Sequence, residues 1–457
     1  MTMFLEKIRS EGLAHLSYIV GHAGRAAVID PRRDCQAYID IAREQGARIT
    51  HVFETHKNED YVTGSRELAR RTGAEIHHGK NFDFDYGSPV EEGDSFEFGD
   101  LRIKVLETPG HTYESISLVL EDNNSAEGKP VAVFTGDALF IGDVGRTDFF
   151  PDRRKEVAEL LYDSIHEKLL PLGDDVLLYP AHGAGSVCGS GMAPREFSTI
   201  GIERRHNPML SKSREEFVKI KSTEQLDAPA YFKMMEKLNK EGSDAPMCEV
   251  REPKAMMPDE FAEALETAQV VDIRSPEAVA GAFIEGSIAI PTSMISGYAG
   301  YFLDYDRPIL LVSDSDNHVI GAWRQLIRMG FDNVEGYLAG GMHDWEISGR
   351  NYDRIRAVHV DELVERINSG EEFTLLDVRK DEEVEQGKLP GAVHIFLGEL
   401  PDRLDEIPSR RPITTFCGSG MRAVIAASIL KKNGYGEVED SLGSMAACQM
   451  RGCPIEK

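Results

Sequence analysis

Residues 55–61, with the sequence T-H-K-N-E-D-Y, directly follow an apolar segment of β type (residues 49–53) and precede a helical one. Three later loops are built in the same way, because each follows a short apolar strand and carries His111, Asp137 or His182. Loops at strand ends bring side chains from distant parts of a chain into one cleft. Four such loops, with three histidines and one aspartate, predict a single metal site.

Four short signatures carry a resemblance to a known family. Thr-His, Pro-Gly-His-Thr, Thr-Gly-Asp and Pro-Ala-His-Gly occur in this order. In this respect residues 1 to about 240 resemble the metallo-β-lactamase superfamily, which implies an αββα sandwich. The usual opening motif of that superfamily, H-x-H-x-D-H, supplies ligands for two metals. Here Asn58 and Tyr61 replace its second and third histidines, so a two-zinc site would lose two imidazole ligands.

The motif residues that remain are His56, His111 and Asp137. Two imidazoles and one carboxylate, with the other positions open, are the set with which non-haem Fe(II) oxygenases bind oxygen and substrate together. Within the superfamily, this trio resembles the iron ligands of the persulfide dioxygenases, which implies a mononuclear Fe(II) site. The changes at Asn58 and Tyr61 weigh more against a two-zinc hydrolase than against a single iron.

Four further residues are expected to surround the metal ligands. Asp60 and His182 would orient the ligands or hold water, as such neighbouring groups do, or would themselves be weak ligands. Asn58 and Tyr61 are expected in the same surrounding layer.

Residues 142–148, with the sequence Gly-Asp-Val-Gly-Arg-Thr-Asp, resemble the persulfide dioxygenases in particular. Arg146 and Asp148 are near enough in sequence to pair and to shape the wall of the site, although Arg146 could instead bind a substrate carboxylate through two hydrogen bonds. His77 and His78 belong to a separate predicted strand and lack partners at ligand spacing. We therefore expect these two histidines to be surface or structural residues.

The composition restricts the class of protein. The chain has 457 residues, enough for two to four domains, and its 51 Lys and Arg against 78 Asp and Glu give a formal net charge of −27. Such an acidic surface argues against nucleic-acid and membrane-surface partners. The sequence has no apolar run of about 18 residues that would predict a membrane span, and its N-terminus does not resemble a signal peptide. Six cysteines without a C-x-x-C pair fit a reducing cytoplasm.

The second half of the chain contains an internal repeat. Residues 270–274 (VVDIR) match residues 375–379 (LLDVR), and residues 308–312 match residues 412–416. Buried strands that alternate with helices predict two small α/β domains with parallel sheets, and both resemble rhodanese domains. A linker rich in turn-forming residues, 242–246, precedes the repeat. This organisation predicts three domains, which are residues 1–241, 250–352 and 356–457.

In the second copy, the loop that follows the central strand contains a cysteine, which the matching loop of the first copy lacks. The loop reads Cys417-Gly418-Ser419-Gly420-Met421-Arg422, and a helix follows. Backbone N–H groups at a helix N-terminus stabilise an anion, and Arg422 closes the loop. These features lower a cysteine pKa below its free value of about 8.5 and make Cys417 a competent nucleophile. Related phosphatases have a loop one residue longer, which makes room for phosphate, so the shorter loop favours a persulfide.

The first copy has Ser313, which is not a thiol, at the matching position. Asp314 and Asp316 in the same loop would repel an anion, so this domain cannot carry a persulfide and is expected to be a structural or docking module. In the C-terminal tail, Cys448 and Cys453 are expected to be ordinary buried thiols.

Together these features resemble bacterial fusions of one persulfide dioxygenase domain with two rhodanese repeats. The resemblance implies that a low-molecular-weight thiol persulfide, glutathione persulfide or an analogue, is oxidised with O2 to sulfite. Cys417 would then pass a sulfane sulfur to sulfite to give thiosulfate, as a cytoplasmic sulfide detoxification. A homo-oligomer is also expected. Two alternatives stay open: a zinc thioester hydrolase of the glyoxalase II type, and a sulfur-carrier scaffold with a silent metal domain.

Overall fold

The computed structural model describes residues 3–456 with the exception of 125–127, 187, 188, 190, 227, 228, 230, 243–246, 248, 409 and 410. Contacts within the chain divide it into two units. Unit 1 consists of Met1–Glu249 and Ile327–Gly330, and unit 2 of Val250–Leu326 and Phe331–Lys457. Apart from Gly242, the linker that the sequence predicts at residues 242–246 lies outside the described residues.

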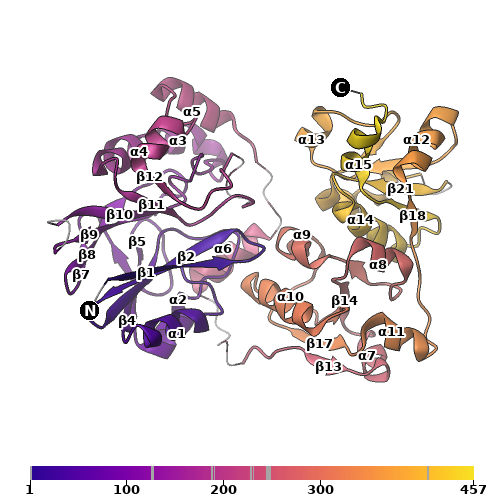
Figure 1. The fold of residues 1–457 in the computed structure, drawn as a ribbon, viewed down its shortest axis with the longest axis horizontal. Helices are drawn as coiled ribbons and strands as arrows, with labels where there is room; N and C mark the ends of the chain where they lie inside the picture. Colours follow the sequence, from indigo (N-terminus) through magenta and orange to yellow (C-terminus); the bar gives the residue numbers. More distant parts are fainter. Residues whose placement is uncertain are drawn as a thin grey trace. The chain divides into compact units, whose positions relative to one another are not determined.

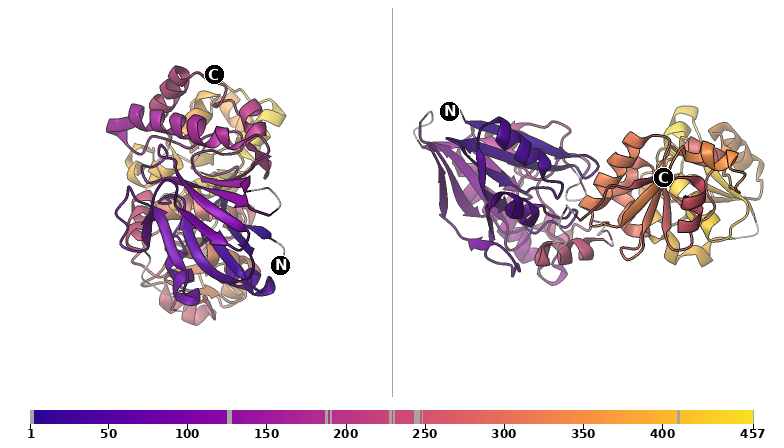
Figure 2. Two further views of the ribbon diagram at one scale, coloured as in Figure 1. Left: turned by 90° about the vertical axis from the view of Figure 1, so that its left-hand side faces the viewer. Right: turned by 90° about the horizontal axis from the view of Figure 1, so that it is seen from below.

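Unit 1 is built from two six-stranded sheets that pack face to face, with helices on the outer side of each sheet (Figures 1 and 2). In spatial order, the first sheet contains β1 (Phe4–Ser10), β2 (His15–His22), β3 (Arg25–Ile29), β4 (Arg48–Glu54), β5 (Glu75–Gly79) and β6 (Ser88–Val90). The second contains β12 (Ser198–Thr199), β11 (Leu177–Pro180), β10 (Lys129–Gly136), β9 (Ile116–Asp122), β8 (Leu101–Glu107) and β7 (Ser95–Phe98).

The strands follow from the distribution of apolar residues. β2 and β9 are buried along nearly their whole length, because both of their faces are covered. β8 instead alternates, with Leu101, Ile103 and Val105 in the core between the sheets, as expected for a strand with one exposed face. This core between the two sheets supports the strand ends that carry the predicted metal ligands.

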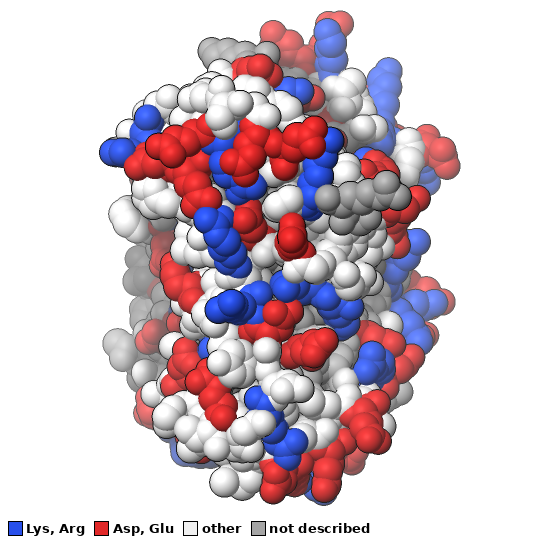
Figure 3. Space-filling view, turned by 90° about the vertical axis from the view of Figure 1, so that its right-hand side faces the viewer, with Lys and Arg blue, Asp and Glu red and all other residues white. Residues whose placement is uncertain are grey.

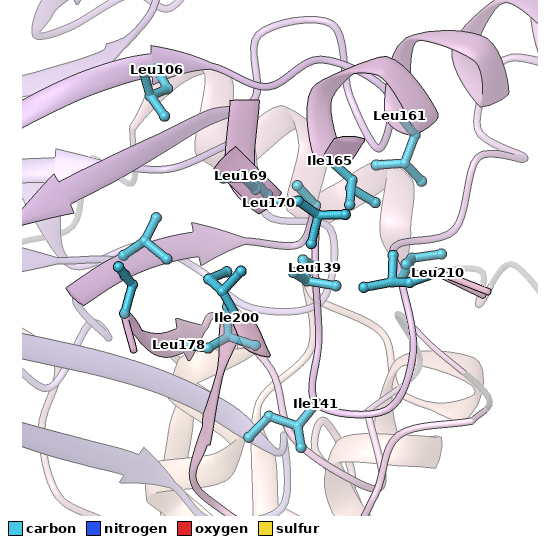
Figure 4. Close-up of a cluster of buried hydrophobic side chains, with 14 of the residues drawn as sticks. Leu106, Leu139, Ile141, Leu161, Ile165, Leu169, Leu170, Leu178, Ile200 and Leu210 are labelled. Carbon is cyan, nitrogen blue, oxygen red and sulfur yellow. The ribbon is translucent and has the colours of Figure 1, made fainter. Parts of the chain in front are cut away.

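Helices form a second and a third apolar core on the outer faces of the two sheets. α1 (Gln36–Glu44) and α2 (Ser65–Thr72) cover the first sheet through Tyr38 and Leu68. The second sheet is covered by α3 (Arg154–Asp163), the π-helical turn that continues it, α4 (Ile200–His206) and α5 (Arg214–Thr223). Figure 4 shows the resulting cluster, in which Ile165 lies beside Leu170, and Leu178 of β11 lies beside Ile200. The last helix of this unit is α6 (Phe232–Glu241).

Unit 2 contains two five-stranded sheets in which every strand pair is parallel. The first sheet contains, in spatial order, β13 (Lys254–Met256), β17 (Val334–Leu338), β16 (Ile309–Val312), β14 (Gln269–Asp272) and β15 (Ile288–Ala289). The second contains β18 (Arg356–Val358), β22 (Val438–Ser441), β21 (Ile413–Phe416), β19 (Thr374–Asp377) and β20 (Val393–His394). The two topologies are identical, as the internal repeat predicts.

Helices alternate with these strands in both copies. The first copy has α7 (Pro258–Ala264), α8 (Pro276–Gly281), α9 (Ile295–Phe302), α10 (Asp316–Arg328) and α11 (Gly341–Ile347). The second has α12 (Val360–Ser369), α13 (Asp381–Glu385), α14 (Met421–Lys432) and α15 (Ser444–Arg451). An αββα unit followed by two α/β domains with parallel sheets confirms the predicted fold class.

The repeated D-x-R motif forms the same buried ion pair in both copies. Arg274 Nη2 lies 2.6 Å from Asp272 Oδ2 in the first copy, and Arg379 Nη2 lies 2.6 Å from Asp377 Oδ2 in the second. Both arginines also donate to a backbone carbonyl oxygen of the loop that follows. The motif therefore fixes the end of a central strand, which explains its presence in a copy without a cysteine.

The C-terminal cysteines differ from the expectation. Cys448 and Cys453 form a disulfide, with their Cα atoms 5.0 Å apart, so the prediction of two ordinary thiols was wrong. The pair forms because Gly452 has a left-handed backbone with φ of 69°, which turns the chain back after α15. Cys35 and Cys417 are buried free thiols.

Acidic and basic side chains are interspersed over the face of the molecule drawn in Figure 3. The formal net charge of −27 is therefore not gathered into one patch on that face. Within the described ranges, no helix combines the length and the apolar character that crossing a membrane requires.

Candidate metal centre and cysteine loop

Four strand ends of unit 1 bring the predicted metal residues together. His56 follows β4, His111 follows β8, Asp137 follows β10 and His182 follows β11. All four side chains are buried, with at most 2% of their surface exposed. The loops approach each other so closely that a Cβ atom at Gly136, the residue before Asp137, would lie 2.6 Å from Thr55 Oγ1. A glycine is therefore required at that position.

Hydrogen bonds orient the two candidate imidazoles. His56 Nδ1 lies 2.9 Å from Thr55 Oγ1, which itself donates to Asp30 Oδ2 at 2.8 Å, so His56 Nδ1 is the donor. His111 Nδ1 donates to the carbonyl oxygen of Arg146 at 2.9 Å. In both rings the Nδ1 atom is thus occupied, and the Nε2 atoms are left to face the centre of the site.

The ligand atoms converge on one point. His56 Nε2 lies 3.7 Å and His111 Nε2 lies 3.5 Å from Asp137 Oδ2. Atoms that share one ion at bond lengths of about 2.1 Å lie roughly 3.0–4.2 Å apart, depending on the angle between the bonds, so these distances suit a single metal. Both Nε2 atoms are buried and lack a hydrogen-bond partner among the described residues. Unpaired buried polar atoms are costly, and a bound ion would remove that cost.

Glu59 joins this cluster, although the sequence did not single it out. Its side chain is buried, and its Oε2 lies 3.7 Å from His111 Nε2. Together with His56 and His111 it forms a group whose ligand atoms all lie within 4.8 Å of one another. The only signal in the sequence is its place in the same loop as His56, which does not say whether the side chain points inward.

Asp137, His182 and Asp60 form a chain of charged groups. His182 Nδ1 lies 2.7 Å from Asp137 Oδ1, and His182 Nε2 lies 3.1 Å from Asp60 Oδ2. Burial alone would raise the pKa of Asp137, but the neighbouring imidazoles of His182 and His56 outweigh it and hold this pKa below its usual range. Likewise, burial opposes protonation of His182, but the carboxylates of Asp137 and Asp60 raise its pKa. His182 therefore lies beside the candidate ligands, where it holds Asp137 in place.

Asn58 and Tyr61 are buried next to the same loop. Asn58 Nδ2 donates to the carbonyl oxygen of His56 at 3.2 Å. The ring of Tyr61 packs on that of His15, with centroids 3.9 Å apart. Asn239 of α6 donates to the carbonyl oxygens of Asn58 and Tyr61, at 2.6 Å and 2.7 Å. Helix α6 therefore fixes the backbone of the ligand loop.

Arg146 and Asp148 form a bidentate pair. Arg146 Nε lies 2.7 Å from Asp148 Oδ1, and Arg146 Nη2 lies 2.8 Å from Asp148 Oδ2. Arg146 Nη2 also donates to the carbonyl oxygen of Leu226 at 3.0 Å, and the guanidinium lies 4.9 Å from the ring centroid of Phe149. Arg146 and Asp148 therefore form a structural ion pair, which is the interpretation that the sequence favours over substrate binding.

His77 does have partners, contrary to the expectation that none lies at ligand spacing. His77 Nε2 lies 3.0 Å from His51 Nδ1, because β4 and β5 are parallel neighbours in which Phe53 is opposite His77 and His51 is opposite Glu75. The Glu75 side chain is 74% exposed. We therefore interpret the contact between His51 and His77 as a hydrogen-bonded pair of imidazoles. His78 is bonded to the carbonyl oxygen of Tyr86 at 2.8 Å and has a structural role.

Cys417 lies at the end of β21 and is fully buried. Its Sγ accepts a hydrogen bond from the backbone N–H of Gly420 at 3.0 Å, and its own N–H donates to Ser444 Oγ at 3.1 Å. Gly420 has φ of 97° and directly precedes α14. The sulfur therefore lies at a helix N-terminus with a donor aimed at it, which is the environment that stabilises a thiolate.

Arg422 is held by two residues that the sequence did not indicate. Arg422 Nη1 and Nη2 lie 2.5 Å and 2.7 Å from the two carboxylate oxygens of Glu383. Arg422 also donates to Tyr298, which belongs to α9 of the first copy. Burial of the Tyr298 hydroxyl raises its pKa, so it stays neutral. The copy without a cysteine thus supplies a side chain to the neighbourhood of Cys417.

Comparisons with known proteins agree with this arrangement. The family model for the metallo-beta-lactamase superfamily matches residues 11–182, and the model for the rhodanese-like domain matches residues 257–348 and 359–450. The protein named persulfide dioxygenase ETHE1, mitochondrial, from Homo sapiens is 35% identical over 223 residues, which cover 47% of this chain and 78% of that protein. The Bos taurus protein of the same name is 34% identical with the same coverage. The chain belongs to the persulfide dioxygenase family.

One solved structure resembles this chain over more than unit 1. It is titled metallo-beta-lactamase from Staphylococcus aureus subsp. aureus COL, is 32% identical, and superposes with a TM-score of 0.66 over 74% of this chain and 99% of its own length. The fusion of one metallo-β-lactamase domain with two rhodanese-like domains is therefore established for this chain. The family and the fold imply a bound metal, and the buried cluster around Asp137 offers its candidate ligands.

Proposed function

We propose that this chain oxidises a low-molecular-weight thiol persulfide with O2 to sulfite, and then combines sulfite with a second sulfane sulfur to give thiosulfate. The observation that carries the proposal is the convergence of two imidazoles and one carboxylate. His56 Nε2 and His111 Nε2 lie 3.7 Å and 3.5 Å from Asp137 Oδ2. Such a set of two imidazoles and one carboxylate suits a mononuclear Fe(II) with open positions. The named relatives support the choice of substrate.

The proposed oxidation is RSSH + O2 + H2O → RSH + SO3²⁻ + 2 H⁺. When bound, Fe(II) supplies the positions at which O2 and the outer persulfide sulfur are brought together and activated. His56 and His111 present Nε2 to the ion, since their Nδ1 atoms are already hydrogen-bonded. His182, held between Asp137 and Asp60, keeps the Asp137 carboxylate in place for the ion. The burial of these groups excludes bulk water from the site.

The proposed sulfur transfer takes place at Cys417. Its thiolate attacks the outer sulfur of a second persulfide, the S–S bond breaks, and the thiolate RS⁻ leaves. Sulfite then attacks the outer sulfur of the Cys417 persulfide, which releases thiosulfate and restores the thiolate. The N–H of Gly420 stabilises the sulfur anion at the start and at the end. An open hollow of about 250 Å³ beside the loop, lined by Arg379, Glu383 and Gly418 among others, gives sulfite access.

We further propose that the chain has three domains, which are residues 1–241, 250–352 and 356–457. We also propose that four residues act only by supporting the metal ligands, namely Asp60, Asn58, Tyr61 and His182. Covalent linkage of the two active domains raises the local concentration of sulfite near Cys417, provided that the linker lets the product reach it. Glutathione persulfide is the proposed substrate, with other thiol persulfides as analogues.

The test is oxygen uptake by iron-loaded protein on addition of glutathione persulfide. Rapid uptake with formation of sulfite, lost in His111→Ala, is the expected result. The matched control is His78→Ala, a buried histidine of the same unit that lies outside the ligand cluster, and it should retain uptake. Absence of uptake from protein with confirmed iron, with glutathione, coenzyme A and cysteine persulfides alike, would contradict the proposal and favour a sulfur carrier with a silent metal domain.

A further inference from the structure

We propose that Glu59 is a fourth protein ligand of the metal, so that the ion is held by two imidazoles and two carboxylates. The inference rests on the metal site of the proposed function but concerns a residue outside the trio of His56, His111 and Asp137. It rests on two observations: the position of the Glu59 carboxylate beside the imidazole of His111, and the absence of a hydrogen-bond partner for its buried Oε2 among the described residues.

The position of Glu59 Oε2 is that of a ligand atom. It lies 3.7 Å from His111 Nε2, the same distance that separates His56 Nε2 from Asp137 Oδ2. It also lies within 4.8 Å of the ligand atom of His56. Donor atoms on opposite sides of an ion with bonds of about 2.1 Å lie roughly 4.2 Å apart, and adjacent ones roughly 3.0 Å. These distances place the Glu59 carboxylate among the donor atoms of His56 and His111, as a ligand of the same ion requires.

The Glu59 carboxylate is buried, and its ion-pair contact is with the imidazole of His111 at 3.7 Å. Glu59 is 5% exposed, and its Oε2 has no hydrogen-bond partner among the residues that the structure describes. Lys57, two residues away, instead pairs with Glu236 at 2.5 Å. A buried carboxylate without a hydrogen-bond partner is stabilised by a cation beside it. An ion bound by His56 and His111 would supply that positive charge.

The hydrogen bond at Nδ1 of His111 leaves its Nε2 as the nitrogen that can bind a metal. His111 Nδ1 contacts the carbonyl oxygen of Arg146, which can only accept, so Nδ1 carries a proton. In a metal-binding imidazole the other nitrogen is unprotonated, and its lone pair then faces Glu59 Oε2 and Asp137 Oδ2 at 3.7 Å and 3.5 Å. An ion bound at this Nε2 would therefore lie close to both carboxylate oxygens.

A second carboxylate changes the properties of the site without closing it. Two carboxylates neutralise the charge of a divalent ion, which strengthens its binding. With Glu59 as a fourth protein ligand, the ion would still have positions open to a persulfide and to O2. Loss of Glu59 is therefore expected to weaken the binding of the metal and to change its coordination, rather than to remove the site.

The experiment is anaerobic titration of the metal-free full chain with Co(II), followed by its visible absorption, and with Fe(II) in competition with a chelator. The variants are Glu59→Gln and, as matched control, Glu114→Gln. Glu114 is also buried and accepts from the N–H of Lys57 in the ligand loop, and the amide oxygen of glutamine preserves that bond. Circular dichroism of each metal-free variant checks that it is folded.

The expected result is that Glu59→Gln weakens Co(II) and Fe(II) binding about 10- to 100-fold and shifts the Co(II) spectrum, whereas Glu114→Gln changes neither. Unchanged affinity and spectrum in Glu59→Gln would overturn the inference, as would equal losses in both variants. Loss of oxygen uptake with unchanged metal binding would assign Glu59 to the substrate and also overturn it. A parent that binds metal with the expected dependence on Glu59 but takes up no oxygen would overturn only the proposed function.

Discussion

The two rhodanese-like copies have the same strand order and the same buried ion pair, yet their central strands end differently. β16 of the first copy is followed by Ser313, and β21 of the second by Cys417. Arg422, which lies in the first turn of α14 in the second copy, has His318 of α10 at the matching place. The fold and the chemistry therefore depend on separate sets of residues.

The loops themselves also differ in shape. α10 begins at Asp316, three positions after Ser313, whereas α14 begins at Met421, four positions after Cys417. The Ser313 hydroxyl donates to the carbonyl oxygen of Ser315 at 3.0 Å and so satisfies its own loop. Around Cys417, the N–H of Gly420 is directed at the sulfur. The first loop is thus closed on itself, and the second directs a backbone donor at the sulfur of Cys417.

The largest effect is expected from Cys417→Ser. Without the thiolate no sulfur can be held, so enzymatic thiosulfate formation should fall by at least about 1000-fold, as for loss of a catalytic nucleophile. Oxygen uptake should remain at the parent rate, because the metal cluster is formed by unit 1 alone. Sulfite and thiosulfate are measured by chromatography after subtraction of the uncatalysed reaction. Thiosulfate formation at the parent rate would show that the second copy is as inactive as the first.

A large effect on stability is expected from breaking the ion pair that both copies share. Asp272→Asn and Asp377→Asn each leave a buried arginine without its charged partner, which costs about 3–5 kcal/mol of unfolding free energy. The two losses should be similar, since the pairs have the same geometry. Urea unfolding measures both, with the exposed Asp402→Asn as control. A loss confined to one copy would contradict the equivalence of the two ion pairs.

A smaller effect is expected from Tyr298→Phe, which tests whether the first copy supports the second. Removing the hydroxyl deletes one hydrogen bond to Arg422, worth about 0.5–1.5 kcal/mol, so kcat/KM for anionic sulfur compounds should fall roughly 2- to 10-fold, mainly through KM. Alkylation of Cys417 by neutral iodoacetamide should not change. Tyr301→Phe on the same helix is the matched control. Equal behaviour of the two variants would assign Tyr298 a packing role only.

The smallest effect is expected from Ser313→Cys in a chain that also carries Cys417→Ser. The new thiol would lie in a loop with Asp314 and Asp316 and without an arginine, so its thiolate is not stabilised. Sulfur transfer from thiosulfate to cyanide should stay at the level of the Cys417→Ser chain. Recovery of even a tenth of the parent rate would mean that a cysteine alone makes a rhodanese loop active.

Local signals were enough to predict the residues that end strands. His56, His111, Asp137 and Cys417 each follow a short apolar run, and a strand end has a defined place in a sheet. The repeat predicted the parallel topology of unit 2 for the same reason, since alternating strands and helices leave few arrangements.

Contacts between distant segments could not be predicted in this way. The His51–His77 pair depends on the register of β4 against β5, and the contact of Tyr298 with Arg422 depends on how α9 packs on the second copy. The inward direction of Glu59 depends on the path of a loop rather than on a repeating pattern. Such features follow from tertiary packing, which the linear sequence does not display.

The most direct test of the proposed coupling between oxidation and sulfur transfer is the number of persulfide molecules consumed per O2. Coupled oxidation and sulfur transfer require two persulfides per O2 in the parent, because one is oxidised to sulfite and a second supplies the sulfur of thiosulfate. Cys417→Ser should consume only one persulfide per O2 and accumulate sulfite. A ratio of one in the parent as well, or consumption of persulfide without oxygen by protein with bound iron, would contradict the proposed coupling of the two sites.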